Sequence, residues 1–149
     1  MVSIAVQPPA YAQANQELYP PLVVKAKGLQ HVAAVAVLVD YQGNPVDNAL
    51  QGNYSDTGHQ LTDDGNTMFI FPHLIIPSAG GYYRLRVDVY EIDSETGDWR
   101  MTARTYSREI VAYDETVQYN EQQTRIYALD TGSSEMAVMR LLREQGYLQ

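Results

Sequence analysis

The chain contains no cysteine, only two lysines among 149 residues, and no apolar run of transmembrane length. The lack of cysteine excludes a disulfide scaffold, a thiolate metal site and a cysteine nucleophile, and it fits an intracellular protein. The longest apolar run, Val32 to Val39, suits one buried strand. The first residues lack the basic start and continuous apolar stretch of a signal peptide, so we expect no secretory leader.

Acidic residues outnumber basic ones by 18 to 10, which gives a net charge of −8. At this charge the chain as a whole repels nucleic acid, because phosphate contacts need Lys and Arg. Hydrophobic residues make up 45% of the chain, which argues against disorder and allows one domain with a real core. The twelve tyrosines far outnumber the two phenylalanines. This bias suits half-buried sheet faces and interfaces.

The stretch from Met68 to Ile92 is the most informative for the fold. It predicts a short apolar strand at Met68–Phe71, a Pro/Gly corner and a long strand at Tyr82–Ile92. Side chains alternate along the long strand, which indicates a half-buried strand in an antiparallel sheet. One face carries Tyr83, Leu85, Val87 and Val89, and the other carries Tyr82, Arg84, Arg86, Asp88 and Tyr90.

Turn residues divide the rest of the chain into short segments. Asp93–Asp98 predicts a hairpin loop with Gly97 at positive φ. Ser133–Gln145 is the only good helix, with an apolar stripe and Gly146 as its terminator. This pattern predicts a single all-β domain over residues 1–149, a β-sandwich with one peripheral helix. Further strands are predicted at Val2–Val6, Leu22–Lys27, His31–Asp40, Trp99–Tyr106 and Ile110–Tyr113, with a short one near Gln60–Thr62 and an ambiguous one at Thr124–Leu129.

Five short motifs follow one another along the middle of the chain. They are Leu50-Gln51-Gly52, Asp63-Asp64-Gly65, Phe69-Ile70-Phe71-Pro72-His73-Leu74, Gly81-Tyr82-Tyr83-Arg84-Leu85-Arg86 and Tyr90-Glu91-Ile92. Together they resemble the central block of the velvet domain of fungal developmental regulators. The start, with Gln7-Pro8 and Tyr19-Pro20-Pro21-Leu22-Val23-Val24, and the late Leu141–Gly146 segment are similar to the opening segment and closing helix of that family.

The resemblance implies an immunoglobulin/Rel-like sandwich with an extended N-terminal arm (1–20) and a closing helix (133–146). It also implies homo- or heterodimers with another velvet protein, DNA binding by some members, and control of sporulation and secondary metabolism. The expected location is then the nucleus and cytoplasm of a fungal cell. The chain departs from the family in its arm, where Tyr11–Tyr19 lacks the family's basic residues. The family also continues after the closing helix into a basic strand, whereas this sequence stops at Tyr147-Leu148-Gln149, so either it is a fragment or that strand is missing.

Four arginines are candidates for DNA contact. Arg84 and Arg86 alternate on one predicted strand, and Arg100 and Arg104 alternate on the next. If the two strands pair with these faces aligned, four guanidinium groups share one surface that could hold phosphate or guanine edges. The alternative is a solvated sheet face that Asp88, Glu91 and Glu109 partly neutralise, and the net charge favours this alternative or a protein partner over DNA. Three tyrosines flank this surface as candidate interface residues: Tyr82, Tyr90 and Tyr106.

Lys25 and Lys27 are the other candidate DNA contacts. They alternate on an early strand, where they could contact a backbone phosphate beside the arm or protect an edge strand from aggregation. The three histidines have no partner at metal-ligand spacing, so we expect no metal site. Asp63-Asp64-Gly65-Asn66 lacks the ligand pattern of a calcium loop and is better explained as a turn.

No nucleophile elbow, phosphate loop or dinucleotide fingerprint occurs, so we expect neither an enzyme nor a cofactor. We also expect no membrane association. Two other functions stay open beside the velvet interpretation. One is a carbohydrate- or ligand-binding sandwich whose site would come from Asn48–Thr67 and the tyrosines. The other is an adaptor that does not bind DNA.

Overall fold

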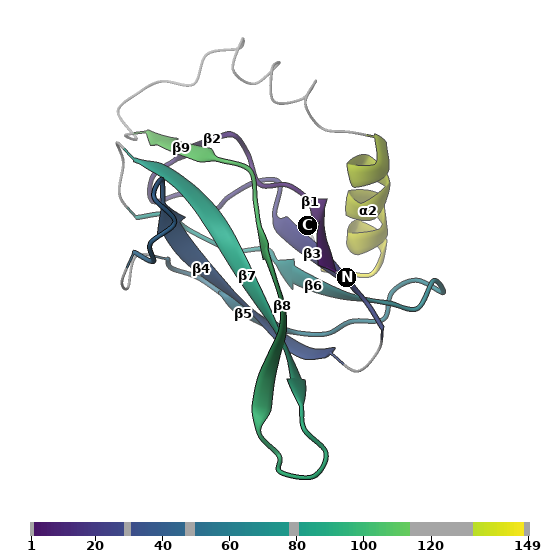
Figure 1. Cartoon of the computed structure of the whole chain (residues 1–149). Helices are drawn as coiled ribbons and strands as arrows, with labels where there is room; N and C mark the ends of the chain where they lie inside the picture. Colours follow the sequence, from purple (N-terminus) through teal and green to yellow (C-terminus); the bar gives the residue numbers. More distant parts are fainter. Residues whose placement is uncertain (1, 29–30, 47–49, 78–80, 114–132, 148–149) are drawn as a thin grey trace.

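The computed structural model describes residues 2–28, 31–46, 50–77, 81–113 and 133–147. Within them nine strands form two sheets, and one helix lies near the C-terminal end, so the predicted all-β sandwich is confirmed (Figure 1). The elements are β1 (Val2–Val6), β2 (Tyr11–Gln13), β3 (Leu22–Lys27), β4 (His31–Asp40), β5 (Ser55–Thr57), β6 (Asn66–Phe71), β7 (Tyr82–Ile92), β8 (Trp99–Tyr106), β9 (Ile110–Tyr113) and α2 (Ser133–Glu144).

The smaller sheet has the order β1-β3-β6 and is antiparallel throughout. The larger sheet has the order β2-β9-β7-β4-β5, with β8 paired to β7 beside β9. Its longest pairing joins β4 to β7, the two strands with the clearest sequence signal. The short pairing of β2 with β9 is parallel. The strand β4 is therefore internal, as its run of Val and Ala predicts.

The main core lies between the two sheets. Leu85, Val87 and Val89 of β7 are fully buried there and meet Phe69 and Phe71 of β6. The alternating pattern of β7 is thus confirmed, because its apolar residues face inward and most of its polar residues face outward. Burying these large side chains supplies most of the favourable free energy of folding.

The helix α2 forms a third layer on the outer face of the smaller sheet. Met139 and Leu142 pack against Val6, Val23 and Ile70, which are outward-facing residues of β1, β3 and β6. At the N-terminal end of α2, the Glu135 carboxylate accepts the backbone N–H of Gln7 at 3.0 Å. The predicted amphipathic stripe therefore packs on the sandwich, in the way that an apolar helix face normally does.

The N-terminal arm is more ordered than the sequence predicts. It contains β2, and Ala12, Ala14 and Leu18 are buried. The predicted strand near Gln60–Thr62 is wrong, because the strand forms earlier, at β5. Polar β5 has no apolar alternation, and it is held by pairing with β4. The ambiguous Thr124–Leu129 segment lies outside the described residues.

Candidate interaction surface

The β7–β8 hairpin extends beyond the rest of the larger sheet (Figure 1). Its loop is stabilised by Asp93, whose carboxylate accepts the backbone N–H groups of Glu95 at 2.8 Å and Thr96 at 3.2 Å. These hydrogen bonds hold the pKa of Asp93 below its ordinary value. Gly97 has φ of +75°, as the loop pattern predicts. Within the described part of the chain, β8 pairs only with β7.

The register of this hairpin contains a bulge that the sequence does not signal. Asp88 lies opposite Arg104, whereas Tyr90 lies opposite Met101, so the pairing shifts by one residue at Thr102. Directly opposed residues share a face, and an extra residue reverses which residues of the bulged strand lie on that face. Arg104 therefore lies on the outer face of the sheet. The bulge places Arg100 on the other face, opposite Glu91.

The outer side of the hairpin forms one continuous surface, which we call the hairpin face. It holds all three predicted interface tyrosines and three of the four predicted arginines. It also holds three large apolar side chains that the sequence analysis did not select. Its residues are Tyr82, Arg84, Arg86, Asp88, Tyr90, Ile92, Trp99, Met101, Arg104 and Tyr106.

Acidic partners neutralise most of the arginines. The buried carboxylate of Asp88 lies 2.7 Å from Arg104 Nε and 3.2 Å from a terminal nitrogen of Arg86. The hydrogen bond to Asp88 raises the pKa of Arg104 above its ordinary value. On the other face, Arg100 lies 3.3 Å from Glu91. The four guanidinium groups therefore do not share one surface, because Arg100 lies on the other face. Of these four arginines, Arg84 is exposed, and no partner for it is seen among the described residues.

The two lysines lie on the opposite side of the molecule from the hairpin face. Lys25 and Lys27 alternate with Val24 and Ala26, which face the main core, so both lysines face outward from the smaller sheet. The strand β3 lies between β1 and β6, so the alternative that these lysines protect an edge strand is wrong. The structure does not bring the six predicted DNA contacts together on one surface.

The distal part of the hairpin face is apolar and exposed. Trp99 is 58% exposed, and its ring lies 6.0 Å from that of Tyr90. Unbroken alternation along β8 would place Trp99 and Met101 on the inner face with Ala103, away from Arg104. The bulge turns them outward instead, where Ile92 joins them. A large exposed patch of this kind is typical of an interaction site.

The histidines are dispersed, and the described part of the chain holds no group of three or more potential metal ligands. His73 pairs with Glu17 at 3.2 Å, and His59 pairs with Asp56 at 3.0 Å. The predicted turn at Asp63–Asn66 is present. There the Asp64 carboxylate accepts hydrogen bonds from Thr62 and Asn66, which lower its pKa. None of the described helices has the length and hydropathy needed to span a membrane.

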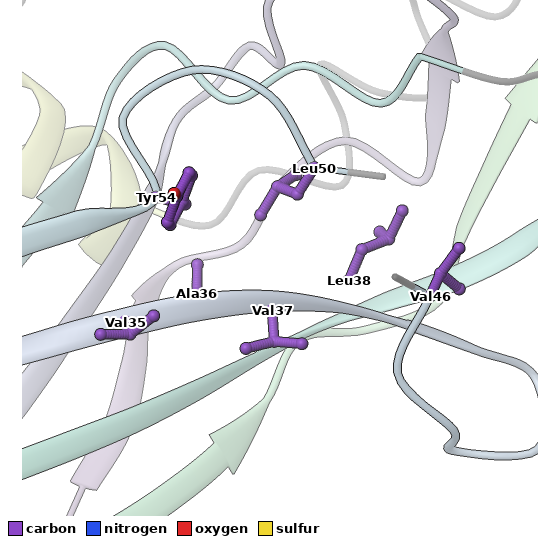
Figure 2. Close-up of a pocket in the computed structure, with 7 residues that line it drawn as sticks. All are labelled: Val35, Ala36, Val37, Leu38, Val46, Leu50 and Tyr54. Atoms are coloured by element: carbon purple, nitrogen blue, oxygen red, sulfur yellow. The ribbon is translucent and has the colours of Figure 1, made fainter. Parts of the chain in front are cut away.

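A small cavity of about 220 Å³ lies at the edge of β4, beyond the three residues that β5 covers. Its volume is below the roughly 300–1,000 Å³ typical of small-molecule sites. In Figure 2, Leu38, Leu50 and Tyr54 gather on one side of β4, whereas Val35 and Val37 lie on the other. Apart from the Tyr54 hydroxyl, the side chains that line it are apolar.

No protein-family model matches the chain, and no curated protein matches it. The resemblance to velvet domains therefore has no support beyond the motifs within the chain. One of these motifs, Gly81–Arg86, enters β7 and leads directly into the hairpin face.

Proposed function

We propose that this chain is a velvet-type regulatory domain that acts by pairing its hairpin face with another velvet-domain protein, as a homo- or heterodimer. The observation that carries the proposal is the exposed Trp99 on a projecting hairpin, beside Tyr90, Ile92 and Met101. The chain has a single tryptophan, and the tertiary structure leaves it uncovered. Regulation of transcription, sporulation and secondary metabolism in the nucleus and cytoplasm follows from the velvet resemblance.

The composition of the hairpin face supports a protein partner. Trp, Tyr, Met and Arg are enriched at protein interfaces, and hot spots concentrate in Trp, Tyr and Arg. Asp88 orients the guanidinium groups of Arg86 and Arg104, so less side-chain entropy is lost when a partner binds. Polar groups flank an apolar end, which resembles the usual division of an interface into core and rim.

Double-stranded DNA is a second partner of this proposal, but not one that the chain binds alone. Arg84 is exposed, whereas Lys25 and Lys27 lie on the far side of the sandwich and the arm has no basic residue. Binding DNA needs several phosphate contacts on one surface. We propose that the partner supplies the basic arm and that this chain adds Arg84 with its paired neighbours Arg86 and Arg104.

Replacing Trp99 with alanine is expected to weaken binding of a velvet partner by at least about thirtyfold, because truncation of a central interface tryptophan costs about 2 kcal/mol or more. The measurement is a titration of the labelled chain with itself and with a velvet protein that has the basic arm. Tyr41→Ala is the matched control, since Tyr41 is 76% exposed but lies in the turn after β4. Equal affinities for Trp99→Ala and Tyr41→Ala would show that the hairpin face is not part of the interface.

DNA binding is expected only in the mixture of the two proteins, with an affinity that falls steeply as salt rises. Arg84→Ala in the mixture is expected to reduce the slope of log affinity against log salt by about one, as the loss of one phosphate contact should. Lys27→Ala, on the opposite face, should leave the slope unchanged. DNA binding by this chain alone would contradict the proposal that the partner must supply the basic arm. An unchanged salt slope for Arg84→Ala would show that Arg84 does not contact DNA.

Two alternatives have support of their own. The neutralised arginines favour an adaptor that pairs with a protein and never contacts DNA, and dimerisation without DNA binding would select it. The support for a ligand-binding module is the polar lining of a cavity of about 180 Å³ in the arm, where Tyr11 and Tyr19 lie together with glutamines, although this cavity too is smaller than the usual small-molecule site. Absence of both partner and DNA binding would shift the assignment to this module.

A further inference from the structure

The C-terminal end of α2 brings together three polar side chains that the proposed dimer does not use. Gly146 has φ of +84° and ends the helix in a Schellman motif, in which the N–H of Tyr147 donates to the carbonyl of Leu142 at 2.9 Å. This turn directs Tyr147 onto the smaller sheet, where its ring meets His59 edge-on with centroids 4.8 Å apart. The site lies on the helix side of the sandwich, away from the hairpin face.

The three groups form a continuous chain of hydrogen bonds. Tyr147 Oη lies 3.1 Å from His59 Nδ1, and His59 Nε2 lies 3.0 Å from Asp56 Oδ2. The same carboxylate oxygen accepts the backbone N–H of Ile70 at 2.8 Å, which anchors Asp56 to β6. Asp56 therefore has a fixed position from which it orients the imidazole ring.

The hydrogen-bond partners determine the direction of each bond when the imidazole is neutral. An ionised carboxylate only accepts, so His59 Nε2 must carry the hydrogen that points to Asp56. His59 Nδ1 is then an acceptor, and the hydroxyl of Tyr147 donates to it. A hydroxyl held by a base, which is itself oriented by a carboxylate, has the arrangement of an activated nucleophile.

A cavity of about 160 Å³ opens beside the hydrogen-bonded Asp56, His59 and Tyr147 and gives small molecules access to them. Asp56, His59 and Tyr147 all contribute to its lining, and none of the three is fully buried. The remaining lining includes the polar side chains of Asn53 and Ser55. A small reagent can therefore approach the phenol oxygen from the solvent.

We propose that Tyr147 is a base-assisted nucleophile and a site of covalent acylation by a small activated acyl donor. The Tyr147 oxygen attacks the acyl carbon, the carbon–oxygen bond of an aryl ester forms, and the bond to the leaving group breaks. The phenolic proton passes to His59 Nδ1, and the leaving group departs with its electron pair. Asp56 is a positioning residue that stabilises the imidazolium ion formed in this step.

The test is acetylation of the full chain by N-acetylimidazole, with the rate at each tyrosine followed by mass spectrometry of its peptides. Tyr147 is expected to react faster than Tyr41, although Tyr41 is much more exposed. His59→Gln is expected to slow Tyr147 by roughly a hundredfold, the usual contribution of a general base, and to leave Tyr41 unchanged. Asp56→Asn should alter the pH–rate profile of Tyr147 alone.

Tyr147→Phe is the control for folding and assignment, since it keeps the ring and removes the reacting oxygen. It should abolish the label at this position while circular dichroism and the thermal midpoint show a folded protein. Rates that simply follow exposure, with Tyr41 faster than Tyr147, would overturn the proposal. An unchanged Tyr147 rate in folded His59→Gln would overturn it as well.

Discussion

Replacing Phe69 with alanine is expected to lower the free energy of unfolding by about 3–5 kcal/mol. Phe69 is fully buried between the two sheets, so its removal costs the transfer free energy of the ring and leaves a cavity. A domain of this size typically has only about 5–15 kcal/mol of stability, so the variant should lose a large share of it. Urea unfolding followed by circular dichroism measures the change.

Tyr41→Ala is the control for this experiment. Tyr41 is an aromatic residue of similar size in an exposed turn, and its loss should change stability by no more than about 0.5 kcal/mol. The two variants thus separate burial from aromatic character. Equal midpoints for Phe69→Ala and Tyr41→Ala would mean that β6 does not contribute to the main core and would contradict the sandwich.

Gly52→Ala is expected to destabilise the chain by more than about 2 kcal/mol, because it combines positive φ with a steric overlap. Gly52 has φ of +92°, and a Cβ there would lie 1.8 Å from the carbonyl oxygen of His73. The adjacent residue Gln51 exchanges two backbone hydrogen bonds with Ile75, so the two segments cannot separate without breaking them. Thermal unfolding measures the loss.

Gly43→Ala is the matched control, since Gly43 has a similar φ of +85° and no atom within 4 Å of its added Cβ. Gly43→Ala should lower the free energy of unfolding by only about 1–2 kcal/mol, the cost of holding alanine at positive φ. The difference between the two variants isolates the close approach of the segments around Gly52 and His73. A loss for Gly52→Ala no greater than for Gly43→Ala would show that the overlap is relieved at little cost.

The elements that the sequence predicts correctly are those whose signal is local. β4 and β7 have long apolar or alternating runs, and α2 has an amphipathic stripe with a terminating glycine. The sequence analysis missed β2 and misplaced β5, because the stability of these two strands comes from partners that are distant in sequence. β2 is held by a parallel pairing with β9, and β5 is polar and held by β4. Such pairings have no counterpart in local periodicity.

For the candidate sites too, the sequence places correctly only the residues whose position follows from local alternation. Residue composition alone selects Tyr82, Tyr90 and Tyr106 as interface candidates, and uniform alternation places them correctly on one face. The same alternation fails for Arg100 and Trp99, since one extra residue at Thr102 exchanges the two faces of β8 beyond it. The chain of Asp56, His59 and Tyr147 has no sequence signature, because 88 positions separate His59 from Tyr147.

The sequence by itself therefore determined the all-β class, the principal strands and the C-terminal helix, since each depends on periodicity or turn residues, whereas the velvet resemblance of its short motifs remains a prediction. Only the tertiary structure decided which charges are neutralised and which aromatic residues remain exposed. A buried Asp88 that contacts arginines from two strands is a property of register, and register is set by the packing of the whole sheet. The exposure of Trp99 likewise depends on register, because the bulge at Thr102 turns its side chain to the outer face of the sheet.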